Sequence, residues 1–179
     1  MSVPRIPPPK PLLSINLTKD ELAFATSVGK LRRFRNVADG VAEKIFSGKD
    51  PALINVQGAL GEFVFAKMFG FAWDINTKPR KGGVDFECKN GIMIDVKHTE
   101  QTVDPRLRNS QHKIERDYHA DVYVLIAGPV CGPKFSMMGY AFHGDLMKEE
   151  NIDRGSYMLP ARKLLWDLEG FRILIGRER

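Results

Sequence analysis

The stretch that decides the fold reads V-D-F-E-C-K-N-G-I-M-I-D-V-K-H-T and spans residues 84–99. Two strand-like runs, 84–89 and 92–99, flank the Asn90-Gly91 dipeptide, which is the strongest short signal for a β-hairpin. The β-branched and aromatic residues in these runs are typical of strands. The stretch therefore predicts two antiparallel strands joined by a tight turn.

The length of the hairpin loop decides which side chains share a face. A two-residue loop at Asn90-Gly91 would place Asp85 and Asp95 on opposite faces, because side chains alternate along a strand. A three-residue loop with Gly91 in the left-handed conformation would pair Asp85 with Asp95 on one face. Lys97 follows Asp95 by two residues and shares its face in either register. If these residues form one site, we predict the three-residue loop or a bulge near Asp85.

Two carboxylates and an amine on a half-buried sheet face are unusual as packing. Like charges opposite each other repel, and a desolvated charge is costly unless it is paired or bound to a metal. Apolar residues surround Asp95 on its strand, which favours a buried position. The alternative is a solvent-exposed cluster of salt bridges on the hairpin face.

A helix is predicted from about Pro51, a residue suited to the first turn, to about Gly70, a natural stop. Gly58 and Gly61 are costly inside a helix, which suggests that its backbone approaches another element closely. Glu62 follows directly, and we expect it to join the face that carries Asp85 and Asp95. The expected buried side of the helix comprises Leu53, Val56, Leu60, Phe63 and Val64.

The rest of the chain divides into an arm and a single domain. Residues 1–17 are proline-rich and predict an extended arm, and 18–179 predict one domain that opens on a capping box at Thr18 and Glu21. Helical spacing continues through Leu31, Phe34, Val37, Val41 and Ile45. Further strands are expected at 71–75, 121–127, 135–142 and 171–176, with a short helix or irregular crossover at 106–118. This order predicts a layered α/β domain.

Composition limits the function classes. The 179 residues carry a formal charge of +5 with a pI of about 9.2, which points mildly toward polyanionic partners. No apolar run is long enough to span a membrane, and two cysteines are too few for a disulfide framework or a zinc cage. We expect a protein of the reducing cytoplasm.

The acidic residues and the lysine resemble the signature of the PD-(D/E)XK nuclease superfamily. Glu62 matches the acidic residue of the first core helix, Asp85 the strand aspartate, and Asp95-Val96-Lys97 the (D/E)-x-K motif. Val84 replaces the proline of the family name. The match covers roughly 52–127 and implies a restriction-endonuclease-like αβββαβ core, a mixed central sheet flanked by helices, with an N-terminal helix and C-terminal additions. The remainder looks similar to small phage and prophage members, which implies a bacterial or phage-infected host cell.

The resemblance implies a nuclease, most simply an endonuclease, that hydrolyses DNA with Mg²⁺ or Mn²⁺. Asp85, Asp95 and the backbone carbonyl of Val96 would bind the metal, Glu62 would hold a water ligand or a second ion, and Lys97 would orient the attacking water. Because the chain is short, cutting of two strands would require a homodimer. The alternative is a catalytically silent DNA-binding or phage assembly protein. The expected DNA contacts are Arg32, Arg33, Arg35, Lys78, Arg80, Lys81, Thr99, Arg106, Arg108 and Lys113.

Overall fold

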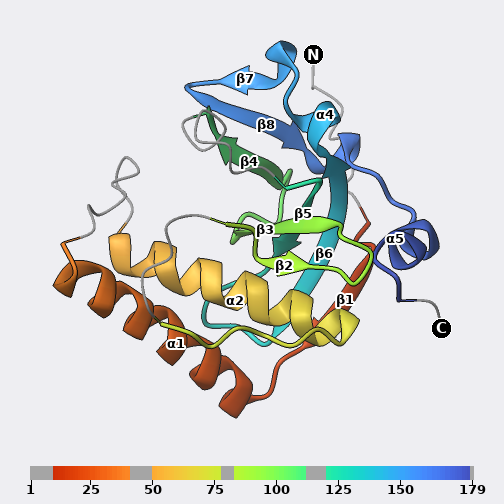
Figure 1. The fold of residues 1–179 in the computed structure, drawn as a ribbon. Helices are drawn as coiled ribbons and strands as arrows, with labels where there is room; N and C mark the ends of the chain where they lie inside the picture. The colour runs from red at the N-terminus through yellow and green to blue at the C-terminus, as the bar shows by residue number, and fades with distance from the viewer. Residues whose placement is uncertain (1–9, 41–49, 78–82, 112–119, 178–179) are drawn as a thin grey trace, which may run out of the picture.

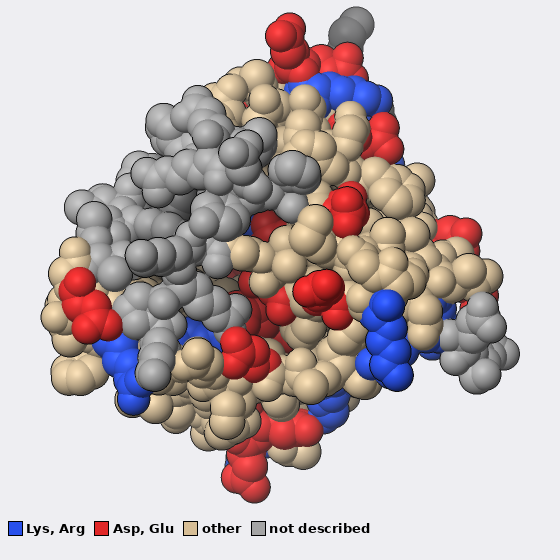
Figure 2. Space-filling view, viewed as in Figure 1, with Lys and Arg blue, Asp and Glu red and all other residues tan. Residues whose placement is uncertain are grey.

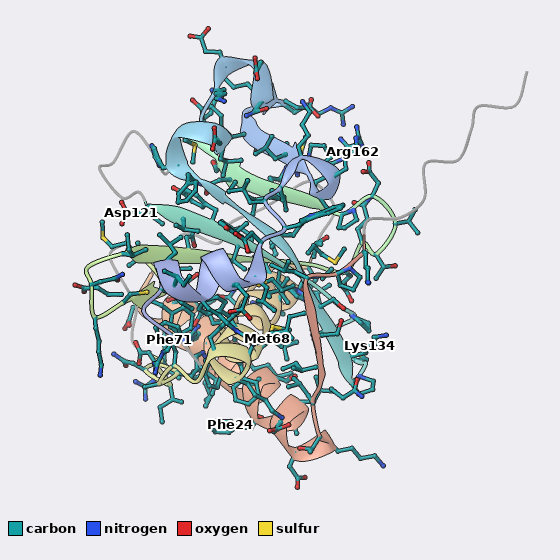
Figure 3. All side chains as sticks on the ribbon, turned by 90° about the vertical axis from the view of Figure 1, so that its right-hand side faces the viewer. Phe24, Met68, Phe71, Asp121, Lys134 and Arg162 are labelled. Carbon is teal, nitrogen blue, oxygen red and sulfur yellow. The ribbon has the colours of Figure 1, made fainter. Side chains whose placement is uncertain are left out.

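A central sheet separates two helices from a second, smaller sheet in this chain. The computed structural model describes residues 10–40, 50–77, 83–111 and 120–177. Helices α1 and α2 cover one face of a five-stranded sheet, and a three-stranded sheet lies on the other face (Figure 1). The side view shows the same layers, with Phe24 among the helices and Arg162 beside the smaller sheet (Figure 3). The protein is therefore a mixed α/β protein, as the sequence predicted.

Helix α1 (Lys19–Ala38) begins at the predicted capping box. The Glu21 N–H donates to Thr18 Oγ1 at 3.2 Å, and the Thr18 N–H donates to Glu21 Oε2 at 2.8 Å. A side chain on Gly29 would place its Cβ 2.7 Å from Val56 Cα, so the two helices cross in close contact there. The apolar residues at helical spacing, in contrast, are largely exposed: Leu31, Phe34 and Val37. Val41 and Ile45 lie outside the described residues.

Helix α2 (Pro51–Phe69) has both predicted ends. The Asp50 side chain accepts a hydrogen bond from the Ala52 N–H at 2.8 Å, and Gly70 ends the helix in the left-handed conformation with φ of 68°. A Cβ on Gly61 would lie 2.9 Å from His98 Cβ, whereas a Cβ on Gly58 would meet open space. The close approach predicted from two glycines is therefore confirmed at Gly61 and wrong at Gly58.

The central sheet has the strand order β1-β6-β5-β3-β2. Strands β3 and β5 are parallel, and every other neighbouring pair is antiparallel. Strand β5 is buried along its whole length, as its apolar run predicted. The bounds are β1 (Leu13–Asn16), β2 (Phe86–Glu87), β3 (Met93–Thr99), β5 (Val122–Ala127) and β6 (Lys134–Phe142).

Strand β1 corrects the predicted bounds of the extended arm. Leu13 pairs with Met137 and Ile15 with Phe135, so the sheet already begins inside the segment 1–17. Leucine and isoleucine alternate with polar residues there, and this alternation gives the strand one buried side. The prolines thus precede the strand rather than define the segment.

The smaller sheet has the order β4-β8-β7. Its two longer strands, β4 and β8, were not predicted. Strand β4 (Arg106–Ser110) replaces the short helix or irregular crossover expected at 106–118, of which 112–119 lie outside the described residues. It pairs with β8 (Ser156–Pro160), some fifty residues later in the chain. The remaining elements are β7 (Ile152–Asp153), α4 (His143–Leu146) and the 3₁₀ turns η1 (Glu149–Asn151) and η2 (Ala161–Lys163).

Two expected strands are absent from the described chain. Residues 71–75 form no strand, because Phe71 stacks on Phe65 at 5.6 Å between ring centroids and Trp73 meets Phe63 at 5.0 Å. Phe71 also meets Phe86 of β2 at 5.4 Å between ring centroids, so the segment packs against α2 and the edge strand without joining the sheet. The segment 171–176 lies mostly in α5 (Leu168–Leu174), which Asp167 caps by accepting the Gly170 N–H at 2.9 Å.

Candidate functional site

The hairpin adopts the predicted three-residue loop. Phe86 pairs with Ile94, a register that places Asp85 opposite Asp95. The Cys88 N–H donates to the Ile92 carbonyl at 2.8 Å, and Gly91 has the left-handed φ of 83°. The two-residue loop is therefore excluded, and the predicted three-residue loop is confirmed.

Asp85 is fixed against strand β3 on both sides of Asp95. Its N–H donates to the Ile94 carbonyl at 3.0 Å, and its Oδ2 accepts the Val96 N–H at 2.7 Å. Burial raises the pKa of Asp85 well above its usual value, the charges of Asp95 and Glu62 raise it further, and Lys97 lowers it. The carboxyl group therefore sits in a region that carries an excess of negative charge.

Asp95 and Lys97 share one face of β3, as strand alternation predicted. Lys97 Nζ forms an ion pair with Asp95 Oδ2, and only 8% of Asp95 is exposed. In the parallel register they pair with Tyr123 and Leu125, which pack toward the smaller sheet. The burial of Asp95 contradicts the alternative of a solvated salt-bridge cluster.

The backbone of Val96 faces Asp85. In an extended strand the N–H and C=O of one residue project to the same side, and the Val96 N–H points to Asp85. Its carbonyl oxygen consequently projects to the Asp85 side of β3. The carboxylates of Asp85 and Asp95 and the carbonyl oxygen of Val96 are thus available as ligands from neighbouring positions of the hairpin.

Glu62 is near this group but is held from the opposite face of the sheet. The contact of Gly61 with His98 shows that α2 packs on the face opposite Asp95, so the expectation of one common face was wrong. Both carboxylate oxygens of Glu62 accept from Arg32 Nη1, at 2.9 and 2.8 Å. Trp73 Nε1 adds a hydrogen bond to Oε2 at 3.3 Å. Gly61 allows α2 to approach the sheet closely, but α2 packs on the face opposite Asp95.

The donor set suits a hard cation with few protein ligands. Among the described residues, no group of three or more His, Cys, Asp or Glu side chains is arranged to hold a metal ion. Mg²⁺ usually takes only one or two carboxylates and completes its shell with water and phosphate oxygens. Asp85, Asp95 and the Val96 carbonyl fit that requirement, and the like charges beside Asp85 are what a divalent cation would neutralise.

The acidic residues gather in a hollow of the surface. Figure 2 shows acidic side chains in and around a depression at the centre of the face, where Figure 1 places β2 and β3. Basic side chains on this view lie toward the periphery of the described surface. Among the described residues, acidic side chains therefore mark this hollow.

The expected DNA contacts fall into three groups. Arg32 is directed inward, because its guanidinium also donates to the Asp74 and Asn76 carbonyls at 2.7 and 3.4 Å; we therefore remove it from the expected contacts. Arg35, Arg106 and Arg108 are exposed, whereas Arg33 and Thr99 are half-buried. Lys78, Arg80, Lys81 and Lys113 lie outside the described residues.

Sequence reasoning missed the side chains that support the site. Trp73 packs against the main core and also donates its indole N–H to Glu62. Tyr123, opposite Asp95, is 1% exposed; its hydroxyl accepts the Ala120 N–H at 3.3 Å and lies 3.4 Å from His143 Nδ1. Burial raises the pKa of this phenol. Only the parallel register of β3 and β5 could have identified it.

The fold and the site define a mixed α/β protein with paired carboxylates beside a lysine on its central sheet. The chain belongs to a family of unknown function, DUF5843, whose family model matches residues 11–128. That span runs from β1 to the end of β5 and includes Glu62, Asp85, Asp95 and Lys97. No curated protein and no solved structure matches the chain. No described helix is both long and apolar enough to cross a membrane.

Proposed function

We propose that the protein is a metal-dependent nuclease of the PD-(D/E)XK type, and most simply an endonuclease, that hydrolyses phosphodiester bonds of DNA. The observation that carries the proposal is the hairpin register, because it sets Asp85 opposite Asp95 with Lys97 on the same face as Asp95. Packing alone gives no reason to hold two like charges together in a buried region. A restriction-endonuclease-like core is part of the same proposal.

The residues divide the chemistry among them. Asp85, Asp95 and the Val96 carbonyl would hold Mg²⁺ or Mn²⁺, which supplies neutralisation of phosphate charge and a lowered pKa for a coordinated water. Lys97 would orient the attacking water and offset the negative charge that develops on the phosphorus centre. The water oxygen would form the new P–O bond and lose its proton to solvent, while the bond to the leaving sugar oxygen breaks and that oxygen takes a proton from solvent.

Lys97 suits an electrostatic role better than the role of a base. A carboxylate within contact distance favours the charged form of an amine, and Lys97 forms an ion pair with Asp95. A charged ammonium can stabilise a transition state, whereas it accepts no proton. Arg106 and Arg108 on β4 are exposed in the layer that the Asp95 face packs toward, and they would contact the DNA backbone.

The test is cleavage of supercoiled plasmid, single-stranded DNA and branched DNA with Mg²⁺, Mn²⁺ or a chelator. Asp95→Ala and Lys97→Ala are expected to abolish metal-dependent cutting. Asp153→Ala and Lys148→Ala, which change exposed side chains of the same types, are expected to cut like the wild type. DNA binding without cutting in any metal would favour the catalytically silent DNA-binding or assembly protein instead. Linear product from both strands, dependent on protein concentration, would support a homodimer.

A further inference from the structure

The carboxylate of Glu62 is enclosed by partners that belong to other elements. Arg32 on α1 contacts both of its oxygens, and Trp73, beyond the end of α2, contacts one. The side chains of Arg32 and Glu62 are only 14% and 12% exposed. A charge-assisted contact to both oxygens fixes where the carboxylate lies.

Arg32 itself is anchored at several points. Its guanidinium donates to the Asp74 and Asn76 carbonyls and lies 5.8 Å from the centre of the Trp73 ring. The base of the side chain is also fixed, because α1 meets α2 in close contact at Gly29. The position of Glu62 therefore depends on a structure that spans both helices and the segment after α2.

We propose that Arg32 is a positioning residue that keeps Glu62 outside the ligand set of a single metal ion held by Asp85 and Asp95. The inference rests on the proposed function and decides between the two roles open to Glu62, a contact to a water ligand and a contact to a second ion. Direct ligation would place a cation close to the Arg32 guanidinium, and the arginine paired with Glu62 cancels the charge that would attract a second cation.

Binding of Mn²⁺, followed by the electron paramagnetic resonance signal of the free ion, tests this without any turnover. The wild type is expected to bind one Mn²⁺ at a site that Asp95→Asn removes. Arg32→Gln is expected to raise the affinity about tenfold or to add a second ion, because Glu62 becomes available as a ligand. Glu62→Gln in the wild-type background is expected to change the affinity less than about threefold.

The double variant R32Q/E62Q separates ligation from a simple charge effect. A long-range field is additive, so removal of the Arg32 charge would then raise the affinity equally in the wild-type and E62Q backgrounds. Recruitment of Glu62 as a ligand predicts a gain in the wild-type background and almost none in the E62Q background. Equal gains would overturn the inference, and so would an E62Q loss as large as that of Asp95→Asn.

Two further variants keep the test interpretable. Lys30→Gln removes an exposed positive charge from the same helix, and we expect it to leave Mn²⁺ affinity unchanged. If R32Q unfolds, Arg32→Lys retains the charge but loses the contact to both oxygens, and its gain must again vanish in the E62Q background. A wild type that binds no Mn²⁺ at the Asp95 site would overturn the proposed metal site itself, whereas lost coupling alone overturns only the role of Arg32.

Discussion

Replacement of Asp85 by asparagine should stabilise the protein without metal and destabilise it with metal. The wild-type carboxyl lies in a buried region beside Asp95 and near Glu62, and both raise its pKa. Asparagine removes this repulsion, and its amide oxygen can still accept the Val96 N–H. A like-charged pair across two strands costs up to about 1 kcal/mol, which corresponds to a rise of about 2–4 °C in Tm for a domain of this size.

Bound metal should make the wild type more stable than D85N. A ligand at a hundred times its Kd stabilises the native state by about 2.7 kcal/mol, or about 5–10 °C here, and D85N lacks one of the two carboxylate ligands. Thermal unfolding followed by circular dichroism, in chelator and in excess Mn²⁺, measures both effects, with Asp153→Asn as the exposed control. If D85N has the lower Tm in chelator, or if Mn²⁺ raises both values of Tm equally, the assignment of Asp85 is wrong.

Four further predictions concern the elements that hold the site and the titration of Asp85. Gly61→Ala should lower the free energy of unfolding by about 1–3 kcal/mol, because its Cβ would meet His98 Cβ at 2.9 Å. Gly58→Ala, whose Cβ would meet open space, should raise the free energy of unfolding by about 0.5–1 kcal/mol. Urea titration measures both changes. Gly91→Ala should cost about 1–2 kcal/mol for its positive φ, and an unchanged urea midpoint would argue against the three-residue loop. Without metal, the contribution of Asp85 to stability should be fully present below its unfolded pKa and be lost as the pH rises through its raised folded pKa. D85N should lack this contribution, so parallel pH profiles for the wild type and D85N would contradict the reasoning.

The hairpin and the helix ends could be predicted because local chemistry determines them. Asn90-Gly91 favours a tight turn, and the positive φ of Gly91 accompanies the three-residue loop that pairs Asp85 with Asp95. Thr18 with Glu21, and Pro51 with Gly70, act within a few residues of the chain. Signals of this kind need no knowledge of the tertiary structure.

The face of the sheet that α2 covers could not be predicted, because it depends on contacts between distant segments. Gly61 allows a close approach from either side, and only its contact with His98 identifies the side. Strand β4 pairs with β8, far along the chain, so its polar sequence carries no local sign of the partner. Arg32 shows the same limit, since a charge run on α1 does not reveal that one member is directed inward to Glu62.

The rate at which the protein cuts supercoiled plasmid in Mg²⁺, measured for the wild type, Lys97→Ala and Lys148→Ala at equal DNA occupancy, tests the central claim most directly. Loss of one positioned charge at a reacting centre typically costs about 10²–10³ in rate. The proposal predicts cutting by the wild type that a chelator stops, a loss of that size in K97A, and unchanged cutting in K148A. Equal rates in all three proteins, or cutting that persists in chelator, would contradict it.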